Sequence, residues 1–297
     1  MNKKMITVFT NKDKKYIELL KMQDEYHIKE IQVPSFFDKI MMKDKQYADI
    51  YFHNGTLDSE ADDKIKNAKK VIVNSFEQRH LIMAKGLTQT NNIDVMYPFV
   101  EQNPFKPKEA KQNIIQKYDL QKDASIILFM SNNFKQGGIK EFLHTLGCLS
   151  DKNFSALIVG NDKDISRLQF VINQSPLANQ IRLIAKNKEG VDVDELFAAA
   201  DIYLAPTYVE NFSINILKAM IAKTAVFVSA MNASREIVDV FGTMSDPNDA
   251  STIFKVDALV AGHEIKKIKK ENKKIAQQYL KEQQLKKLKK IIEQIST

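Results

Sequence analysis

One acidic residue, Glu210, lies in a segment whose pattern is strand, turn and helix. Residues 202–205 form an apolar run that ends at Pro206, which is typical of a buried strand. From Ile214 onward, apolar residues recur at helical spacing. The backbone N–H groups at the start of such a helix can hold a phosphate or a sugar hydroxyl. The turn of residues 206–213 is therefore a candidate binding loop.

The polar residues of this turn also have a simpler explanation. The side chains of Asn211 and Ser213 are able to accept hydrogen bonds from the first N–H groups of the helix, so we expect them to cap it. An ordinary turn between a strand and a helix needs no more than this. The residues alone leave both interpretations open: a capped turn, and a turn whose helix dipole faces a ligand.

A second apolar run, at residues 125–130, is also followed by a polar loop, SNNFKQGGIKEFL, with Lys135 and Lys140 as its cations. Buried strands that alternate with amphipathic helices predict a doubly wound parallel sheet, because parallel strands need crossover connections. Ligands of such sheets lie outside the carboxyl ends of the strands. Both loops, 131–138 and 206–213, are predicted to lie there.

Together these segments resemble glycosyltransferase family 4. In that family a strand ending in Pro-Ser or Pro-Thr leads to a Glu, and a second Glu follows after seven residues. In APTYVENFSINILKAM the first is Glu210, whereas the second position holds Lys218. The family's glycine-bearing loop is matched at Phe134, Gly138 and Ile139. The resemblance covers residues 125–241 and extends to the run VDVDELFAAADIYLAPT.

The charges depart from the family's pattern in both loops. The two basic positions that normally hold the donor diphosphate align with Gln136 and Gly137, which leaves Lys135 and Lys140 nearby. A lysine only donates hydrogen bonds, so Lys218 is unable to accept them from ribose hydroxyls as the family's Glu does. A lysine near a helix start is also unfavourable unless an anion neutralises it. We therefore expect Lys218 to help bind the diphosphate.

The resemblance implies an α/β protein of the GT-B type, with two Rossmann-like, doubly wound domains facing a cleft. The implied divisions are an acceptor-side domain at 1–106, a nucleotide-sugar-binding domain at 107–262 and a basic amphipathic helical tail at 263–297. The first domain is reduced relative to the family. Its short strands are predicted at residues 5–9, 28–33, 48–52, 71–74 and 93–97.

The resemblance also implies roles for single residues. Glu210 would be the catalytic residue that holds the sugar. His53 ends a predicted strand and is a possible acceptor-side residue, although a lone histidine more often bonds locally. The implied donor-binding residues are Lys135, Gln136, Gly138, Asn211, Phe212, Ser213 and Lys218.

All of the excess charge lies in the tail. Residues 263–297 contain eleven Lys and four Glu, which sum to +7, so residues 1–262 sum to zero. Their apolar residues are spaced as one helical stripe among the lysines: Ile265, Ile268, Ile275, Leu285, Leu288 and Ile292. Such a helix suits an anionic bilayer, where each lysine contributes about 1 kcal/mol, and equally suits packing on the protein body. Nucleic acid is not expected, because Tyr279 alone is aromatic among the lysines.

Composition argues against thiol, metal and membrane-spanning chemistry. A single cysteine, Cys148, forms no internal disulfide, and we interpret it as a small buried residue of a predicted helix. Asp192 and Asp194 precede another helix and are interpreted as capping residues, so no metal or other cofactor is expected. There is no signal core and no apolar window of about 18 residues, which predicts a cytoplasmic protein, peripheral at the membrane if the tail binds lipid.

The resemblance implies a retaining glycosyltransferase that moves a sugar from a nucleoside-diphosphate sugar to a cell-envelope glycan of the lipopolysaccharide or capsule type. Two other functions stay open. A catalytically silent relative, acting as a subunit or scaffold, would account for the reduced first domain and the altered charges. A membrane-surface protein that binds sugar or lipid would account for the tail. A fold alone does not decide among them.

Overall fold

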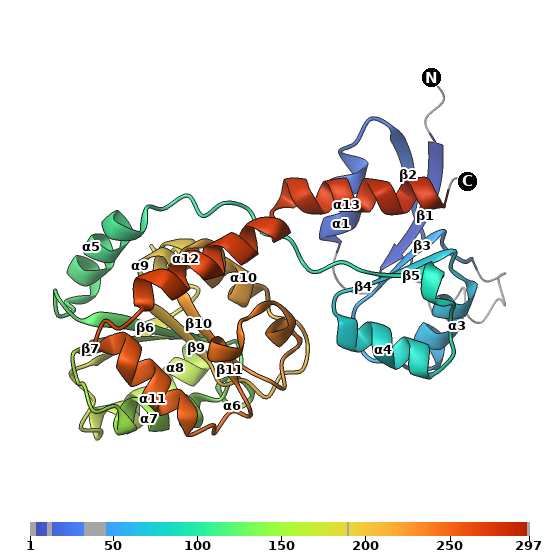
Figure 1. Cartoon of the computed structure of the whole chain (residues 1–297). Coiled ribbons are helices and arrows are strands. Elements are labelled where there is room, and N and C mark those ends of the chain that lie inside the picture. Colours follow the sequence, from blue (N-terminus) through green and yellow to red (C-terminus); the bar gives the residue numbers. More distant parts are fainter. Residues whose placement is uncertain (1–3, 11–13, 33–45, 189, 296–297) are drawn as a thin grey trace. The chain divides into compact units, whose positions relative to one another are not determined.

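The computed structural model describes all residues except 1–3, 11–13, 33–45, 189 and 296–297. Two compact units are present (Figure 1): residues 1–98 with 281–297, and residues 99–280. These limits differ from the sequence-based ones at 106 and 262. The first boundary lies earlier in the linker than expected. The limit at 262 differs because the tail contributes one helix to each unit and forms no unit of its own.

Within the described residues, the sheet of the first unit has five parallel strands in the order β2-β1-β3-β4-β5. The strands are β1 (Lys4–Thr10), β2 (Tyr26–Glu30), β3 (Ile50–His53), β4 (Lys70–Val73) and β5 (Ile93–Val95). The five strands expected from the sequence are thus confirmed, with ends that shift by a few residues. The expected end of one strand at Val33 lies outside the described residues.

Helices cover both faces of this first sheet. They are α1 (Lys15–Lys21), α3 (Ser59–Asn67), α4 (Phe76–Ala84) and α13 (Lys281–Gln294), with a short 3-10 turn η1 (Thr90–Asn92) before β5. The side chains of α1 and α13 join the strands in one apolar core, to which Leu288, Ile291 and Ile292 of the tail contribute. Figure 1 shows α1 and α13 on one face and α3 and α4 on the other.

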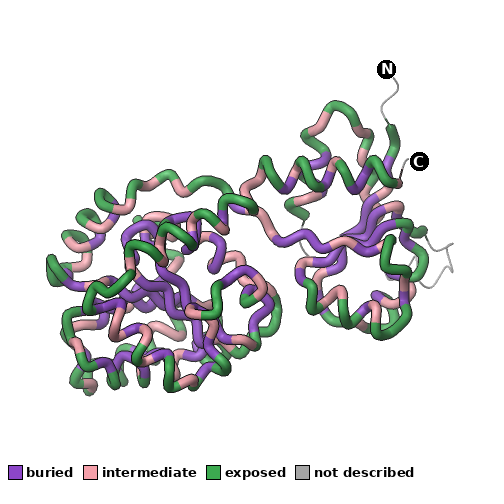
Figure 2. The backbone as a smooth tube through the Cα atoms, viewed as in Figure 1, coloured by how far each residue is buried: buried purple, intermediate pink, exposed green. Residues whose placement is uncertain are grey.

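The second unit has, among its described residues, a six-stranded parallel sheet in the order β11-β10-β9-β6-β7-β8. The strands are β6 (Ser125–Met130), β7 (Phe154–Gly160), β8 (Ile181–Ala185), β9 (Ile202–Ala205), β10 (Ala225–Ser229) and β11 (Thr243–Met244). In each unit, the buried stretches of the backbone follow the strands (Figure 2). This topology confirms the expected doubly wound sheet.

Helices of the second unit lie on both faces of the sheet (Figure 1). Side chains of α7, α8 and α11 form one large core with the strands, and α5, α9, α10 and α12 cover the other face. The helices are α5 (Pro107–Tyr118), α6 (Phe134–Gly137), α7 (Ile139–Cys148), α8 (Asp162–Asn173), α9 (Val193–Ala199), α10 (Ile214–Ile221), α11 (Ser251–Val260) and α12 (Ile265–Ala276). Short 3-10 turns are η2 (Ala233–Ile237), η3 (Val240–Gly242) and η4 (Gln277–Tyr279).

The tail is therefore two helices, which η4 separates. Ile265 and Ile268 of α12 are partly buried against the core of the second unit, and Leu288 and Ile292 of α13 are fully buried in the first unit. Of the two interpretations of the tail, packing on the protein body is confirmed for these apolar side chains. They do not form an exposed face that a bilayer could receive. Among the described residues, no helix combines the length and the apolar character that crossing a membrane requires.

Asp201, directly before β9, fixes the amino ends of the central strands. One of its oxygens accepts the N–H of Ile126 at 3.0 Å, and its carboxylate pairs with Lys111 at 2.6 Å and Lys269 at 2.9 Å. Burial alone would raise the pKa of Asp201, but the two ammonium groups and the hydrogen bonds outweigh it and hold the pKa below the usual range. Asp201 thus joins α5, α12 and β6, at the end of the sheet opposite the candidate loops.

The expectation for Cys148 is wrong. It lies in α7 as expected, but its side chain is exposed. The buried residues of α7 are Phe142, Thr145 and Leu146, and a residue two positions after Leu146 faces the other side of a helix.

Candidate functional site

The two candidate loops are in direct contact at the carboxyl edge of the second sheet. They follow β6 and β9, which are neighbours in that sheet. The N–H of Tyr208 donates to the carbonyl oxygen of Gln136 at 2.9 Å, and the hydroxyl of Thr207 donates to the same oxygen at 3.2 Å. The expected meeting of residues 131–138 and 206–213 at this edge is confirmed.

Gly138 permits this close approach. Its φ angle of +80° lies in the left-handed region, and a Cβ at this position would overlap the carbonyl oxygen of Pro206. Any other residue would have to push the two loops apart. The glycine is therefore a structural requirement of the site.

Gly137 has a similar restriction with a different consequence. It is buried, and a Cβ at this position would overlap the side chain of Ser131. There is thus no room for the basic residue that the resemblance places at position 137. The neighbouring side chains of Lys135 and Gln136 are exposed, and Asn133 caps their short helix by accepting the N–H of Gln136 at 3.1 Å.

Glu210 is held by a third loop, which the sequence reasoning did not assign to the site. This loop follows β10, the next strand in the sheet. The N–H of Ala233 donates to the carbonyl oxygen of Glu210 at 2.8 Å. The buried side-chain amide of Asn232 donates to the carbonyl oxygens of Val209 and Asn211, both at 2.7 Å. The backbone on each side of Glu210 is thereby fixed, and its side chain is exposed to solvent.

The expectation that Asn211 and Ser213 cap α10 through their side chains is wrong. Ser213 is the N-cap residue, yet the helix has no side-chain cap. The N–H of Ser213 itself donates to the hydroxyl of Ser234 at 2.7 Å, so the third loop fixes this turn as well. Asn211 is exposed, and Phe212 is half-buried. Ser213 therefore leaves the backbone N–H groups at the start of α10 without a cap from its own side chain.

Lys218 lies in an environment that differs from the expected one. Because α10 is short, Lys218 falls in its last turn, where the helix dipole favours a cation. Its ammonium pairs with the Asp194 carboxylate of α9 at 2.9 Å, and both side chains are about one third exposed. The anion that we expected a diphosphate to supply is thus present in the chain itself. Asp192 caps α9 as predicted, through the N–H groups of Asp194 and Glu195.

Tyr208 connects the candidate loop to α7. Its hydroxyl donates to Glu141 at 2.9 Å and accepts a longer hydrogen bond of 3.4 Å from Asn248. The hydrogen bond to the Glu141 carboxylate is the main cause that raises the pKa of Tyr208. The phenol ring is partly exposed and lies two residues before Glu210 in the sequence.

His53 belongs to the first unit and is almost completely buried. Its Nδ1 lies 3.1 Å from the hydroxyl of Tyr51, and burial raises the pKa of that tyrosine well above its usual range. This local pairing is the simpler of the two roles weighed for His53. Whether the two domains face a cleft, as the resemblance implies, stays a prediction.

The described side chains include no group of three or more His, Cys, Asp or Glu arranged as metal ligands would be. The residues gathered at this edge are instead hydrogen-bonding groups: the Glu210 carboxylate, backbone N–H groups and the exposed Lys135. Such groups bind hydroxyls and phosphates. Residues 110–290, more than half of the chain, match the family described as "Glycosyl transferases group 1".

The chain belongs to the group 1 glycosyl transferases. Its curated relatives include an uncharacterised glycosyltransferase of Methanocaldococcus jannaschii, 25% identical over 131 residues, or 44% of this chain. The matched segment spans 33% of the relative's length, so the chain covers only about a third of that protein in this match.

Several solved structures have the same fold at low sequence identity. A glycosyltransferase from Rickettsia africae superposes with a TM-score of 0.75 at 14% identity, over 100% of both chains. Anabaena HepE, solved with UDP and glucose, has a TM-score of 0.69 at 13% identity, covering 97% of this chain and 99% of the other. WaaG, a glycosyltransferase involved in lipopolysaccharide biosynthesis, has a TM-score of 0.62 at 13% identity, covering 90% and 94%.

Proposed function

We propose that this chain is a retaining glycosyltransferase of family 4 that uses a nucleoside-diphosphate sugar as its donor. The observation that carries the proposal is the meeting of three loops around Glu210 at the carboxyl edge of the second sheet. Family membership supports it. The similar HepE structure, which contains UDP and glucose, supports a nucleotide-sugar donor.

In this proposal the carboxylate of Glu210 accepts hydrogen bonds from the hydroxyls of the transferred sugar. The backbone N–H groups from Asn211 to Ser213 hold the same sugar or its phosphate. Lys135 and the uncapped start of α10 offset the charge that develops on the departing diphosphate. Because hydrogen bonds within the chain hold these loops, little reorganisation is needed when that charge appears. No metal takes part in the proposed reaction.

The proposed acceptor is a cell-envelope glycan of the lipopolysaccharide or capsule type. The likeness to WaaG, whose name refers to lipopolysaccharide biosynthesis, supports this choice. We propose that the protein acts in the cytoplasm, where nucleotide sugars are available, and meets its acceptor at the inner face of the cell membrane.

A second candidate function is a catalytically silent relative that acts as a subunit or scaffold. Gly137 favours it, because the absence of space beside Ser131 prevents a second basic residue in the phosphate loop. The ion pair of Lys218 with Asp194 favours this function too, because an ammonium that is already paired within the chain adds little to the binding energy of a diphosphate.

Ligand-induced melting shifts separate the two candidates. A panel of UDP, GDP, ADP and TDP sugars is added to the full chain, and the melting temperature is measured at several ligand concentrations. A donor-binding protein gains stability in proportion to the logarithm of ligand concentration over Kd, so one nucleotide of the panel should raise the melting temperature. If none of them does so at millimolar concentration, the silent-relative function is preferred.

A further inference from the structure

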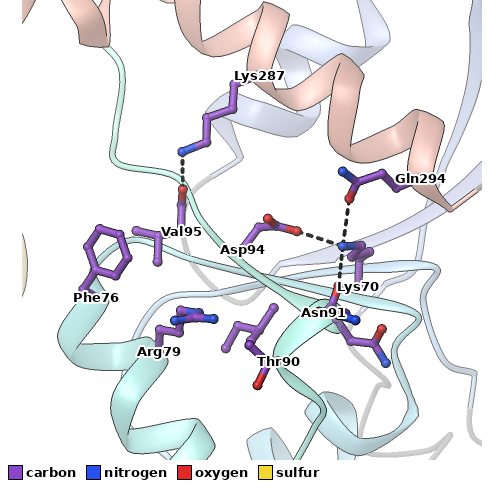
Figure 3. Close-up of a pocket in the computed structure, with 11 residues that line it drawn as sticks. Lys70, Phe76, Arg79, Thr90, Asn91, Asp94, Val95, Lys287 and Gln294 are labelled. Carbon is purple, nitrogen blue, oxygen red and sulfur yellow. Dashed lines mark hydrogen bonds and ion pairs between the residues drawn. The ribbon is translucent and has the colours of Figure 1, made fainter.

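A pocket of about 880 Å³ lies along the outer edge of the first sheet, beside β5 (Figure 3). It contains no residue of the three loops around Glu210. Its walls come from the starts of β4 and α4, from η1 and β5, and from α13 of the tail. The lining residues are Lys70, Phe76, Arg79, Thr90, Asn91, Asn92, Ile93, Asp94, Val95, Lys287 and Gln294.

The pocket carries more positive than negative charge. Its cations are Lys70, Arg79 and Lys287, and Asp94 is its one carboxylate among the lining residues. The Asp94 carboxylate pairs with Lys70 at 3.0 Å, and the same ammonium donates to the carbonyl oxygen of Asn91 and to Gln294. Lys70 and Asp94 therefore neutralise each other, which leaves the charges of Arg79 and Lys287 without a counterion in the lining.

Arg79 is the first of these two charges. It lies in α4 and is partly buried, and the guanidinium has no hydrogen bond or ion pair with any described residue. A guanidinium offers five donors in a planar fork that matches the oxygens of a phosphate or carboxylate. Figure 3 shows its side chain among the residues that line the pocket.

Lys287 is the second. It extends from α13 toward β5, where its ammonium donates to the carbonyl oxygen of Val95 at 2.7 Å (Figure 3). The residue as a whole is exposed, but its ammonium lies against the backbone of β5. Partial loss of solvation there lowers the pKa of Lys287, and the charge of Asp94 opposes the shift in part. The ammonium keeps two protons that donate no hydrogen bond to a described residue. Because its solvation is reduced, an anion binds to it more favourably than to an ammonium in open water.

We propose that this pocket binds a phosphate-bearing ligand through Arg79 and Lys287. A phosphate ester carries between one and two negative charges, which matches the two uncompensated cations. The volume exceeds that of a phosphate group alone, and the exposed ring of Phe76 offers an apolar surface to the rest of the ligand. This chemistry has two sources: a soluble phosphate ester and the headgroup of a phospholipid.

The site is distinct from the proposed donor site. Ligands of doubly wound sheets bind at the carboxyl ends of strands, whereas this pocket runs along an edge strand and reaches η1 at the amino end of β5. Its test therefore does not depend on the proposed transferase activity.

The test is a titration of the full chain with glycerol 3-phosphate and with inorganic phosphate, followed by ³¹P NMR at constant ionic strength. Arg79→Gln and Lys287→Gln should each weaken binding by about tenfold or more, because each removes one charge-assisted hydrogen bond. Lys286→Gln is the matched control: Lys286 is exposed, as Lys287 is, and lies next to it in the same helix, but it does not line the pocket. It should leave binding within twofold of the wild type, as should Glu210→Gln in the other unit.

If Arg79→Gln fails to fold, Arg79→Lys replaces it, because this variant keeps the positive charge and loses only the planar guanidinium. Its affinity for phosphate should lie between those of the wild type and Arg79→Gln. Equal weakening by Lys286→Gln and Lys287→Gln would mean general surface charge and would overturn the proposal. So would binding that Glu210→Gln abolishes while Arg79→Gln leaves it intact.

Sedimentation with vesicles identifies the source of the phosphate. If vesicles of phosphatidylglycerol bind the protein, and Lys287→Gln reduces this binding far more than Lys286→Gln, the ligand is a lipid headgroup. Binding of glycerol 3-phosphate with no vesicle binding identifies a soluble ester. A wild-type protein that binds neither phosphate esters nor vesicles contradicts the proposal.

Discussion

Replacing Gly138 with alanine tests how closely the loops of the proposed donor site are packed. The φ angle of +80° costs a residue with a Cβ about 1–2 kcal/mol. The Cβ also overlaps the carbonyl oxygen of Pro206, so the loops must separate and the hydrogen bond from Tyr208 to Gln136 is lost, at a further cost of about 1 kcal/mol. Gly138→Ala should therefore reduce the stability of the second unit by about 2–3 kcal/mol.

Two other glycines of the same unit separate these contributions. At Gly262 the φ angle is +89° with no atom within 4 Å of an added Cβ, so Gly262→Ala should cost about 1–2 kcal/mol from the backbone alone. Gly147 lies in α7 with an ordinary φ angle and open space, and Gly147→Ala should stabilise by a few tenths to about 1 kcal/mol.

The assay is native-state hydrogen exchange of the amides of β6 and β9, which gives local free energies without assuming that two units unfold together. Nucleotide binding by the Gly138 variant is measured in parallel and should be weakened, because the loops no longer meet. Equal destabilisation by Gly138→Ala and Gly262→Ala would show that the contact with Pro206 is not tight and would refute the reasoning.

Three further substitutions test the supporting contacts. Asn232→Ala removes the buried amide that fixes the backbone on both sides of Glu210. It should lower the free energy of unfolding, measured by denaturation, by about 2–3 kcal/mol, and it should also weaken donor binding. Lys218→Glu places two carboxylates together at Asp194 and should lower the melting temperature. Adding Asp194→Lys should restore part of the lost stability, about 1 kcal/mol or less because both side chains are about one third exposed; no recovery would argue against the ion pair. Asp201→Asn should lower the free energy of unfolding by about 1–3 kcal/mol at pH 7. Because the pKa of Asp201 is depressed in the folded protein, the stability difference between wild type and variant should persist above about pH 4 and shrink as the pH falls through that pKa. A difference that does not change with pH would contradict this.

The sheets were predictable because the sequences of their strands are apolar runs that lie between polar turns. Residues 125–130 and 202–205 are buried along almost their whole length, and a parallel sheet covered on both faces requires this. The edge strand β11 has only two residues, and so short a run leaves no pattern. It was missed for that reason.

The tail shows what periodicity leaves undecided. A single stripe from Ile265 to Ile292 predicted one helix, yet the chain breaks at η4 and its two halves pack against different cores. Amphipathic spacing indicates that a helix has a partner and does not identify the partner. Cys148 illustrates the same limit on a smaller scale, since a helix was predicted correctly and the face was not.

At the candidate site, sequence reasoning located two loops of three. The missing loop carries Asn232 and Ser234, and it follows β10 at the same carboxyl edge. Its position after a buried strand, with polar residues in SAMNASREIV, was the available signal. The partner of Lys218 was not foreseeable, because Asp194 is distant in the sequence and had already been interpreted as part of a cap.

Glu210→Gln tests the central claim most directly. The substitution keeps size and shape and removes only the charge of an exposed side chain, so the melting temperature should stay within about 1 °C of the wild type, as for surface substitutions in general. Sugar transfer or donor hydrolysis, measured with the nucleotide sugar that gives the largest melting shift, should fall by about 10²-fold or more, since a contact strengthened in the transition state is lost. Equal rates for the wild type and Glu210→Gln, or no turnover by the wild type with any donor of the panel, would contradict the assignment of this loop as the catalytic site.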